Sequence, residues 1–373
     1  MTDATARRTV MVVFGGRSSE HQISCATASG VLGAIDRERF EVIPVGITRA
    51  GEWVLEDDDP AKFRLDPETL PEVVDNGTRI LLPNSARHRT VRVAREGRID
   101  DLGDVDVVLP LLHGPFGEDG TLQGMLEMFG LPFVGSKVLA ASVAMDKHYT
   151  KLVLAAAGLR VAPGFTVTDL EWRDEADAVA ARVDALGYPV FVKPARAGSS
   201  VGVSKAKSAD ELAEAMRVAL AEDDHVLVEA GIVGREIEIA VLGSRRGERA
   251  RASVAGEIVM TSAEFYDFES KYLDGSAVRL DCPAELEPEL LAEAQELAVR
   301  AFEALGAEGL ARVDFFLDAD GFVVNEVNTM PGFTPISMFP KCWQATGVEY
   351  PELITELLDV ALSRAESQDA RSA

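Results

Sequence analysis

Residues 311–335, ARVDFFLDADGFVVNEVNTMPGFTP, form the most informative stretch of the chain. Polar and apolar residues alternate over 312–317 and again over 322–328, and this period of two predicts a pair of short strands. The Ala319-Asp320-Gly321 segment between them fits a three-residue hairpin loop with its glycine in the left-handed conformation. The stretch therefore predicts an antiparallel hairpin.

The register of this hairpin places polar side chains opposite one another. Asp314 lies opposite Glu326, and Arg312 lies opposite Asn328, so that all four side chains share one face. Two carboxylates and an amide oxygen form an all-oxygen site that suits Mg²⁺ together with substrate phosphates. The alternative is an acidic face in contact with water. The apolar surroundings and the following Pro331 favour the site.

Length and charge limit the possible functions. A chain of 373 residues is expected to form two or three domains, and its net charge of −25 with a pI near 4.6 argues against a nucleic-acid partner. The cysteines are Cys25, Cys282 and Cys342, whose number and spacing predict reduced thiols without a bound metal. We find no apolar run long enough to span a membrane. These features predict a soluble cytoplasmic protein.

The first part of the chain has the pattern of an α/β domain. Apolar runs at 9–14, 40–47 and 105–112 predict buried strands, and helical patterns lie between them. Strands that alternate with helices predict a parallel sheet. We expect an N-terminal α/β domain over 1–135, with a surface insertion at about 51–100.

Two further units follow. We expect one at 136–229 and another at 230–366 that contains the hairpin, with a disordered tail at 367–373. A helical pattern over 138–157 is interrupted or capped near Asp146. The fold class that these patterns predict is α/β, with a mixed α+β character after the first domain.

Three lysines are candidates for phosphate binding, although the chain lacks both the Walker A and the G-x-G-x-x-G patterns. Lys193 precedes a Gly/Ser loop at 198–202, whose backbone N–H groups could form an anion site. Lys147 begins a helix, and Lys271 lies in the long aromatic loop 261–275, which fits a mobile lid. Each feature has an ordinary alternative, namely a simple turn or a surface loop.

Six segments in order carry a resemblance to a known family. They are FGGRSSEHQIS, LHGPFGEDGTLQG, AMDKHYTK, VKPARAGSSVGV, EFYDFESKY and ARVDFF…VNEVNTMPGFTPIS. With these segments the sequence resembles the ATP-grasp superfamily, and within it the D-alanine–D-alanine ligase family, from Val10 to about Leu362. The stretch 51–100 carries none of the family's motifs.

The resemblance implies a fold, a reaction and cofactors. The fold would be an N-terminal α/β domain followed by a two-domain ATP-grasp fold. ATP would phosphorylate the carboxylate of a first D-alanine, and the amine of a second D-alanine would attack the acyl phosphate, giving D-alanyl-D-alanine for peptidoglycan precursors. The resemblance also implies two Mg²⁺ ions, which Mn²⁺ could replace, and a homodimer.

It further implies roles for individual residues. The residues that would bind ATP are Lys147, Lys193, Ser200, Glu229, Glu236 and Lys271. The metal ligands would be Asp314, Glu326 and Asn328. Catalysis would use Glu20, Ser199, Tyr272, Arg312 and Gly332, and the amino acid substrates would contact His113, Ser337 and Met338.

Tyr272 bears on the choice of acceptor. Related ligases that make an ester with D-lactate typically carry Phe where this chain has Tyr272, so a dipeptide product is preferred. A ligase that makes D-Ala-D-Lac or D-Ala-D-Ser is the nearest alternative. A non-catalytic nucleotide-binding regulator is another, and the intact acidic set of the hairpin argues against it. A nicotinamide-dependent oxidoreductase would need a glycine fingerprint after residues 10–14, which is missing.

Overall fold

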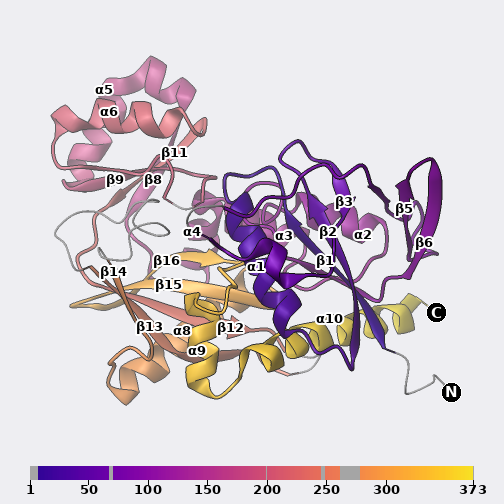
Figure 1. Ribbon diagram of the computed structural model, residues 1–373. Coiled ribbons are helices and arrows are strands. Elements are labelled where there is room, and N and C mark those ends of the chain that lie inside the picture. The colour runs from indigo at the N-terminus through magenta and orange to yellow at the C-terminus, as the bar shows by residue number, and fades with distance from the viewer. Residues whose placement is uncertain (1–6, 67–69, 199, 245–247, 261–277, 373) are drawn as a thin grey trace.

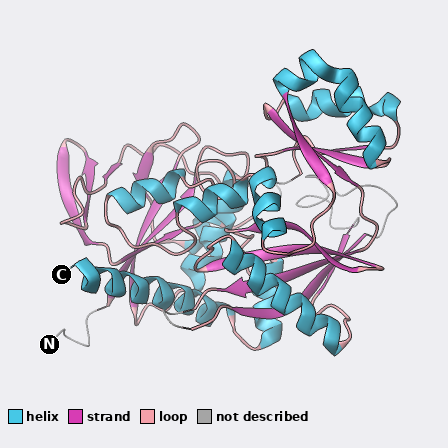
Figure 2. Cartoon of the chain, turned by 180° about the vertical axis from the view of Figure 1, so that it is seen from behind, coloured by secondary structure: helices cyan, strands magenta, loops and turns pink. Residues whose placement is uncertain are grey.

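The computed structural model describes residues 7–66, 70–198, 200–244, 248–260 and 278–372, and Figures 1 and 2 show it from opposite sides. Strands in these residues form four sheets, with the orders β3-β2-β1-β7, β4-β5-β6, β10-β9-β11-β8 and β14-β13-β12-β15-β16. The mixed α/β class predicted from the sequence is confirmed. Every helix in these ranges is too short or too polar to cross a bilayer.

The N-terminal sheet has the parallel arrangement expected from its apolar strands. Strand β1 pairs in parallel with both β2 and β7, and β3 adds an antiparallel edge. Alternate residues of β1 enter two different cores: Val12 packs with residues of α1, whereas Val13 packs with residues of α2. The two helices therefore cover opposite faces. The bounds are β1 Arg8–Gly15, α1 His21–Ala34, β2 Phe40–Ile47, β3 Trp53–Leu55, β7 Val107–Pro110 and α2 Thr121–Met128.

Residues 51–100 are more than the predicted surface insertion. Phe63 is fully buried, and its ring lies 4.7 Å from that of Phe14 on β1. Val91 and Val93 are also fully buried, in the core on the opposite face of the N-terminal sheet. The segment thus completes both cores of the first domain. Its elements are η1 Pro60–Phe63, β4 Arg79–Leu81, β5 Thr90–Arg95 and β6 Arg98–Asp104, in addition to β3.

The middle sheet is antiparallel where β11 joins β8 and β9, and α5 and α6 lie on its outer face (Figures 1 and 2). The predicted interruption near Asp146 is confirmed, because this residue ends α3 and its carboxylate caps α4 by accepting the His148 N–H at 2.9 Å. The bounds are α3 Val138–Met145, α4 Lys147–Ala156, β8 Gly164–Thr168, α5 Asp169–Leu186, β9 Val190–Pro194, β10 Ser204–Ala206, α6 Ala209–Leu220 and β11 His225–Ala230.

The hairpin of β15 and β16 lies at one edge of the C-terminal sheet, and its predicted register is confirmed, with Asp314 opposite Glu326. The predicted three-residue loop is wrong, because Asp318 pairs with Gly321 and leaves a two-residue loop. A bulge beside Phe315 restores the register further along. The bounds are β12 Arg235–Leu242, β13 Arg251–Met260, β14 Val278–Asp281, α8 Pro288–Ala304, β15 Leu310–Asp318 and β16 Gly321–Asn328.

The last two helices return to the first sheet. Trp343 of α9 (Met338–Thr346) and Leu357 of α10 (Tyr350–Ser372) belong to the same buried core as β1 and α1. In Figure 1, the yellow helix α10 accordingly runs beside the indigo strands. Helix α10 extends to Ser372, into the stretch 367–373 for which the sequence predicted a disordered tail.

Phe63→Ala tests whether residues 51–100 are part of the core. We expect a loss of about 3–5 kcal/mol in the free energy of unfolding, because a fully buried aromatic ring is removed. The measurement is urea denaturation. Leu65→Ala is the matched control, since Leu65 is 45% exposed and its loss should cost no more than about 0.5 kcal/mol. Equal, small effects of the two substitutions would contradict the assignment.

Candidate active site

A row of residues crosses four strands of the C-terminal sheet and forms the floor of the candidate site. Gly256 of β13 is paired with Glu238 of β12, Glu238 with Asp314 of β15, and Asp314 with Glu326 of β16. Directly paired residues point to the same face, so three carboxylates stand side by side. In the next row, Arg312 is paired with Asn328. The predicted face of the hairpin therefore continues onto β12.

Arg312 is the cation of this acidic floor. Its Nε and Nη2 atoms each lie 2.7 Å from an oxygen of Asp314, and Nε lies 3.3 Å from Glu238 Oε2. Burial opposes the charge of Arg312, but these carboxylates outweigh it and raise the pKa of the guanidinium well above its ordinary value. Arg312 thus contacts Asp314 directly on the face that the two residues were predicted to share.

The acidic floor fits a divalent cation. Three carboxylates against one guanidinium leave a formal excess of two negative charges. Asn328 donates its amide N–H to Asp314 Oδ2 at 3.0 Å, which directs its amide oxygen elsewhere. Carboxylate and amide oxygens are the donors that Mg²⁺ takes. Asp314, Glu326 and Asn328 therefore remain the proposed ligands, with Asp314 shared between Arg312 and the ion.

A cavity of about 760 Å³ lies between the middle and C-terminal sheets. It gathers most residues that were predicted for ATP, metal or acyl chemistry. Those among its lining are Lys147, Lys193, Ser200, Glu229, Glu236, Arg312, Asp314, Glu326 and Asn328. Segments that lie far apart in the sequence thus meet at one hollow of the size that holds a small-molecule ligand.

The two described lysines that were predicted to bind phosphate, Lys147 and Lys193, are held by neighbouring groups. Lys147 Nζ donates to the carbonyl oxygen of Ala197 at 2.6 Å, which ties the start of α4 to the Gly/Ser loop. Burial lowers the pKa of Lys147, and Glu326 partly offsets this. Lys193 Nζ forms an ion pair with Glu229, a carboxylate 2% exposed. Both lysines and residues of the loop line the same cavity.

Glu20 and His113 meet at the N-terminal side. Gly114 Cα and Gly198 Cα both approach the carboxylate of Glu20 closely: an added Cβ would lie 2.8 Å and 3.4 Å from its Oε2. His113 Nδ1 lies 3.1 Å from the carbonyl oxygen of Met330, and burial lowers the pKa of His113 while Glu20 partly offsets this. A neutral ring that donates through Nδ1 leaves Nε2 as an acceptor.

The residues expected at the acceptor side lie where the hairpin leads into α9. Ser337 precedes α9, and its Oγ lies 2.7 Å from Thr334 Oγ1. Gly332 packs beside it, since an added Cβ would meet Ser337 Oγ at 3.2 Å. Met338 lies over Gly256, where an added Cβ would be only 2.2 Å from Met338 Sδ. Met338 therefore sits at the end of the acidic row.

Some predicted residues lie outside the described part of the chain, namely Ser199, Lys271 and Tyr272. Three further charged residues were not predicted: Glu118 and Glu238 line the cavity, and Lys151 lies behind it. Glu238 shares the face of Glu236 two positions earlier, Glu118 lies in the quoted segment LHGPFGEDGTLQG, and Lys151 follows Lys147 by one helical turn. Strand and helix periodicity could have found Glu238 and Lys151.

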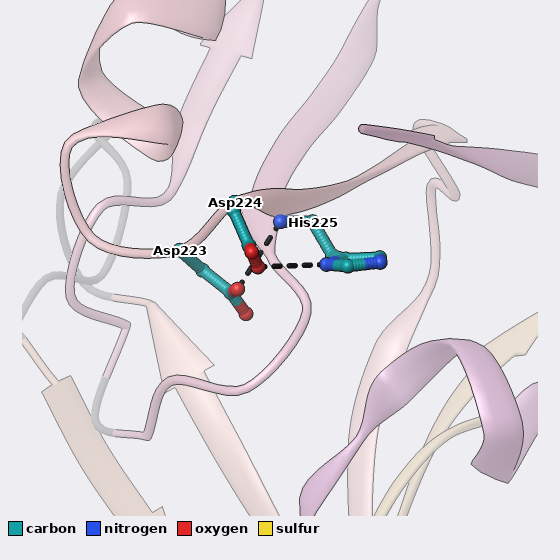
Figure 3. Close-up of side chains that lie close together, drawn as sticks. All are labelled: Asp223, Asp224 and His225. Carbon is teal, nitrogen blue, oxygen red and sulfur yellow. Dashed lines mark hydrogen bonds and ion pairs between the residues drawn. The ribbon is translucent and has the colours of Figure 1, made fainter. Parts of the chain in front are cut away.

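Asp223, Asp224 and His225 lie close together elsewhere, as Figure 3 shows. His225 Nδ1 lies 2.7 Å from Asp224 Oδ1, and Arg196 forms ion pairs with both aspartates. The Arg196 N–H also donates to Asp223 at 2.8 Å. These contacts hold the segment that leads into the Gly/Ser loop, so the cluster has a structural explanation without a bound metal.

Two family models match the chain. Residues 9–136 match the D-ala D-ala ligase N-terminus, and residues 153–359 match the D-ala D-ala ligase C-terminus. Curated relatives with the name D-alanine–D-alanine ligase include that of Kineococcus radiotolerans, 54% identical over 95% of this chain and 96% of the relative. That of an Arthrobacter species is 52% identical over 96% of this chain and 95% of the relative.

Solved structures resemble the whole chain. The D-alanine-D-alanine ligase from Coxiella burnetii has a TM-score of 0.83 and 32% identity, covering 98% of this chain and 97% of its own. The VanG D-Ala:D-Ser ligase from Enterococcus faecalis has a TM-score of 0.82 and 33% identity, covering 95% of this chain and all of its own.

Glu118→Gln tests the half-buried carboxyl beside Glu20. Burial and the charge of Glu20 raise the pKa of Glu118 to about 8, from an ordinary value of 4.5. Between these values the folded protein binds the proton that the unfolded chain releases, so this contribution to stability is complete below pH 4.5 and is lost as the pH rises through 8. Relative to Glu118→Gln, the parent protein should lose stability by up to about 1.4 kcal/mol per pH unit. Urea denaturation from pH 5 to 8 measures this, and a constant difference would contradict it.

Proposed function

This chain belongs to the D-alanine–D-alanine ligase family, and we propose how its residues carry out the ATP-dependent joining of two D-alanines. The enzyme is an ATP-dependent carbon–nitrogen ligase that supplies a peptidoglycan precursor. The observation that carries the residue assignment is the single cavity that collects the lysines of the middle sheet and the acidic floor of the C-terminal sheet.

The ATP phosphates are proposed to lie between the Gly/Ser loop and the acidic floor. Lys147 and Lys193 supply positive charge there, and Ser200 lines the same cavity. Glu229 and Glu236 are proposed to face the adenine and ribose. Each oxygen of Glu229 forms an ion pair with a lysine, Lys193 or Lys151. Glu229 is therefore proposed to affect the nucleotide mainly by positioning these lysines. Lys271 is proposed to reach the terminal phosphate.

Asp314, Glu326 and Asn328 are proposed to hold two Mg²⁺ ions. When bound, Mg²⁺ neutralises charge on the phosphates and polarises the transferred phosphoryl group. The negative excess of the floor and the direction of the Asn328 amide support this assignment. Asp314 would then contact both a metal ion and Arg312, so that it connects the residues proposed to bind phosphate with the residue proposed to stabilise the tetrahedral intermediate.

The amino acid substrates are proposed to lie between the acidic floor and the N-terminal domain. Glu20 would bind the ammonium of the first D-alanine, and His113 would lie near its carboxylate. Arg312 and the N–H of Gly332 would stabilise the oxyanion of the tetrahedral intermediate, which is usually the largest contribution in acyl transfer. Ser337 and Met338, together with Arg312, would contact the carboxylate of the second D-alanine.

We propose that D-alanine is the acceptor rather than D-lactate or D-serine. Tyr272, at the position where related D-lactate ligases typically carry Phe, supports an amine acceptor, and curated relatives about 50% identical to this chain carry the name D-alanine–D-alanine ligase. We also propose, from the family resemblance, a cytoplasmic homodimer with domains at 1–135, 136–229 and 230–366. Light scattering of the purified protein tests the dimer.

The product assay tests the function directly. The protein is incubated with ATP, Mg²⁺ and D-alanine, with and without D-lactate or D-serine, and the products are identified by mass spectrometry. We expect D-alanyl-D-alanine, ADP and phosphate. An ester or D-alanyl-D-serine as the main product would show that D-lactate or D-serine, not D-alanine, is the acceptor. Absence of ATP turnover with D-alanine would refute the proposed function.

Glu326→Gln tests the metal assignment. Loss of one carboxylate charge should lower kcat by at least about a hundredfold, because metal-ion stabilisation of a phosphoryl transition state is worth several kcal/mol. Initial rates of ADP release and a thermal melt measure activity and folding. Asp320→Asn makes the same change at the tip of the hairpin, where the side chain is 88% exposed, and should leave both unaltered. Near-normal turnover by Glu326→Gln would remove Glu326 from the metal site.

A further inference from the structure

Lys151 is a charged residue behind the ATP cavity that the proposed function does not use. It lies on α4 one turn after Lys147, is 8% exposed, and is absent from the cavity lining. Its Nζ lies 2.8 Å from Glu229 Oε2 and 3.5 Å from the carbonyl oxygen of Asn325. Burial of an ammonium group costs free energy unless an opposite charge lies beside it, and for Lys151 that charge is the carboxylate of Glu229.

Glu229 is shared between two lysines. Its Oε1 faces Lys193, which lines the cavity, and its Oε2 faces Lys151, which does not. Burial alone would raise the pKa of Glu229, but the charges of Lys193 and Lys151 outweigh it and lower the pKa to about 2. Glu229 is therefore a carboxylate held from two sides, with one oxygen for each lysine.

We propose that Lys151 is a positioning residue for ATP, which holds Glu229 so that Lys193 keeps its ammonium group available to the nucleotide. The inference rests on the proposed function. Without Lys151, both oxygens of Glu229 are free to turn to Lys193 and draw its ammonium group away from the cavity. The wall also loses one positive charge. Both changes weaken the binding of an anionic nucleotide, whereas Glu20 and His113 on the other side are untouched.

A purely structural role would give a different result. Lys151 would then only neutralise a buried carboxylate, and its loss would lower stability without selectivity among substrates. The chain offers a matched control in Lys62, whose Nζ lies 2.5 Å from Glu56 Oε2, a side chain 1% exposed and outside the cavity lining. Lys62→Met removes the partner of a buried carboxylate away from the ATP site.

The test compares Lys151→Met, Lys151→Arg and Lys62→Met. Removal of the buried ion-pair partner of Glu229 predicts that Lys151→Met raises KM for ATP roughly tenfold or more. KM for D-alanine should stay within about twofold, and Lys151→Arg should recover most of the loss, because it restores the cation. Lys62→Met should leave both KM values unchanged. Titration with ADP in the absence of D-alanine gives the same comparison without turnover.

A double variant keeps the inference falsifiable. If Lys151 acts through Glu229, Glu229→Gln combined with Lys151→Met should weaken ADP binding no more than Glu229→Gln alone, because the effects of coupled residues are not additive. Additive losses, an unchanged KM for ATP in Lys151→Met, or an equal rise in both KM values would overturn the proposal. Failure of the unaltered protein to bind ADP or consume ATP would instead refute the proposed function.

Discussion

The pairing of Arg312 with Asp314 is the interaction on which the site depends. A bidentate guanidinium–carboxylate contact fixes both side chains on the floor of the cavity and lets three carboxylates stand on neighbouring strands without mutual repulsion becoming prohibitive. Removal of either partner would leave an unbalanced buried charge. The same logic applies on the opposite wall, where Glu229 separates the ammonium groups of two lysines.

These charges are held in place by strand pairing and not by loops. Each residue of the acidic floor lies within a strand of one sheet, so its position follows from the hydrogen-bonded register of that sheet. Gly256 completes the arrangement at the far end by leaving room for Met338. Rigid elements position functional groups more precisely than flexible segments do. The floor is therefore preorganised, and substrate binding has only to bring the surrounding segments to it.

The sequence predicted correctly which side chains share a face of the hairpin, because the alternation along each strand determines this independently of the length of the loop. The register of Asp314 with Glu326 was correct although the loop length was wrong, since a shorter loop and a bulge compensate for each other. The contribution of Phe63 to the core was missed because residues 51–100 lack periodicity, and their burial comes from contacts with distant strands. The contacts of Glu229 with two lysines could not be predicted, because they form only where α4, β9 and β11 pack together in the folded chain. No local sequence pattern indicates this packing.

The shared core of the first sheet and the last helices has a consequence for biosynthesis. Val12 and Phe14 emerge from the ribosome more than 300 residues before Trp343 and Leu357, which cover the same face. That apolar face must stay exposed, or be bound by a chaperone, until α9 and α10 have been translated. Contacts between residues so distant in sequence also slow folding, since loop closure precedes any gain from packing. A nascent chain that stalls before α9 would therefore present an aggregation-prone surface, so the synthesis of α9 and α10 is the step that completes this core.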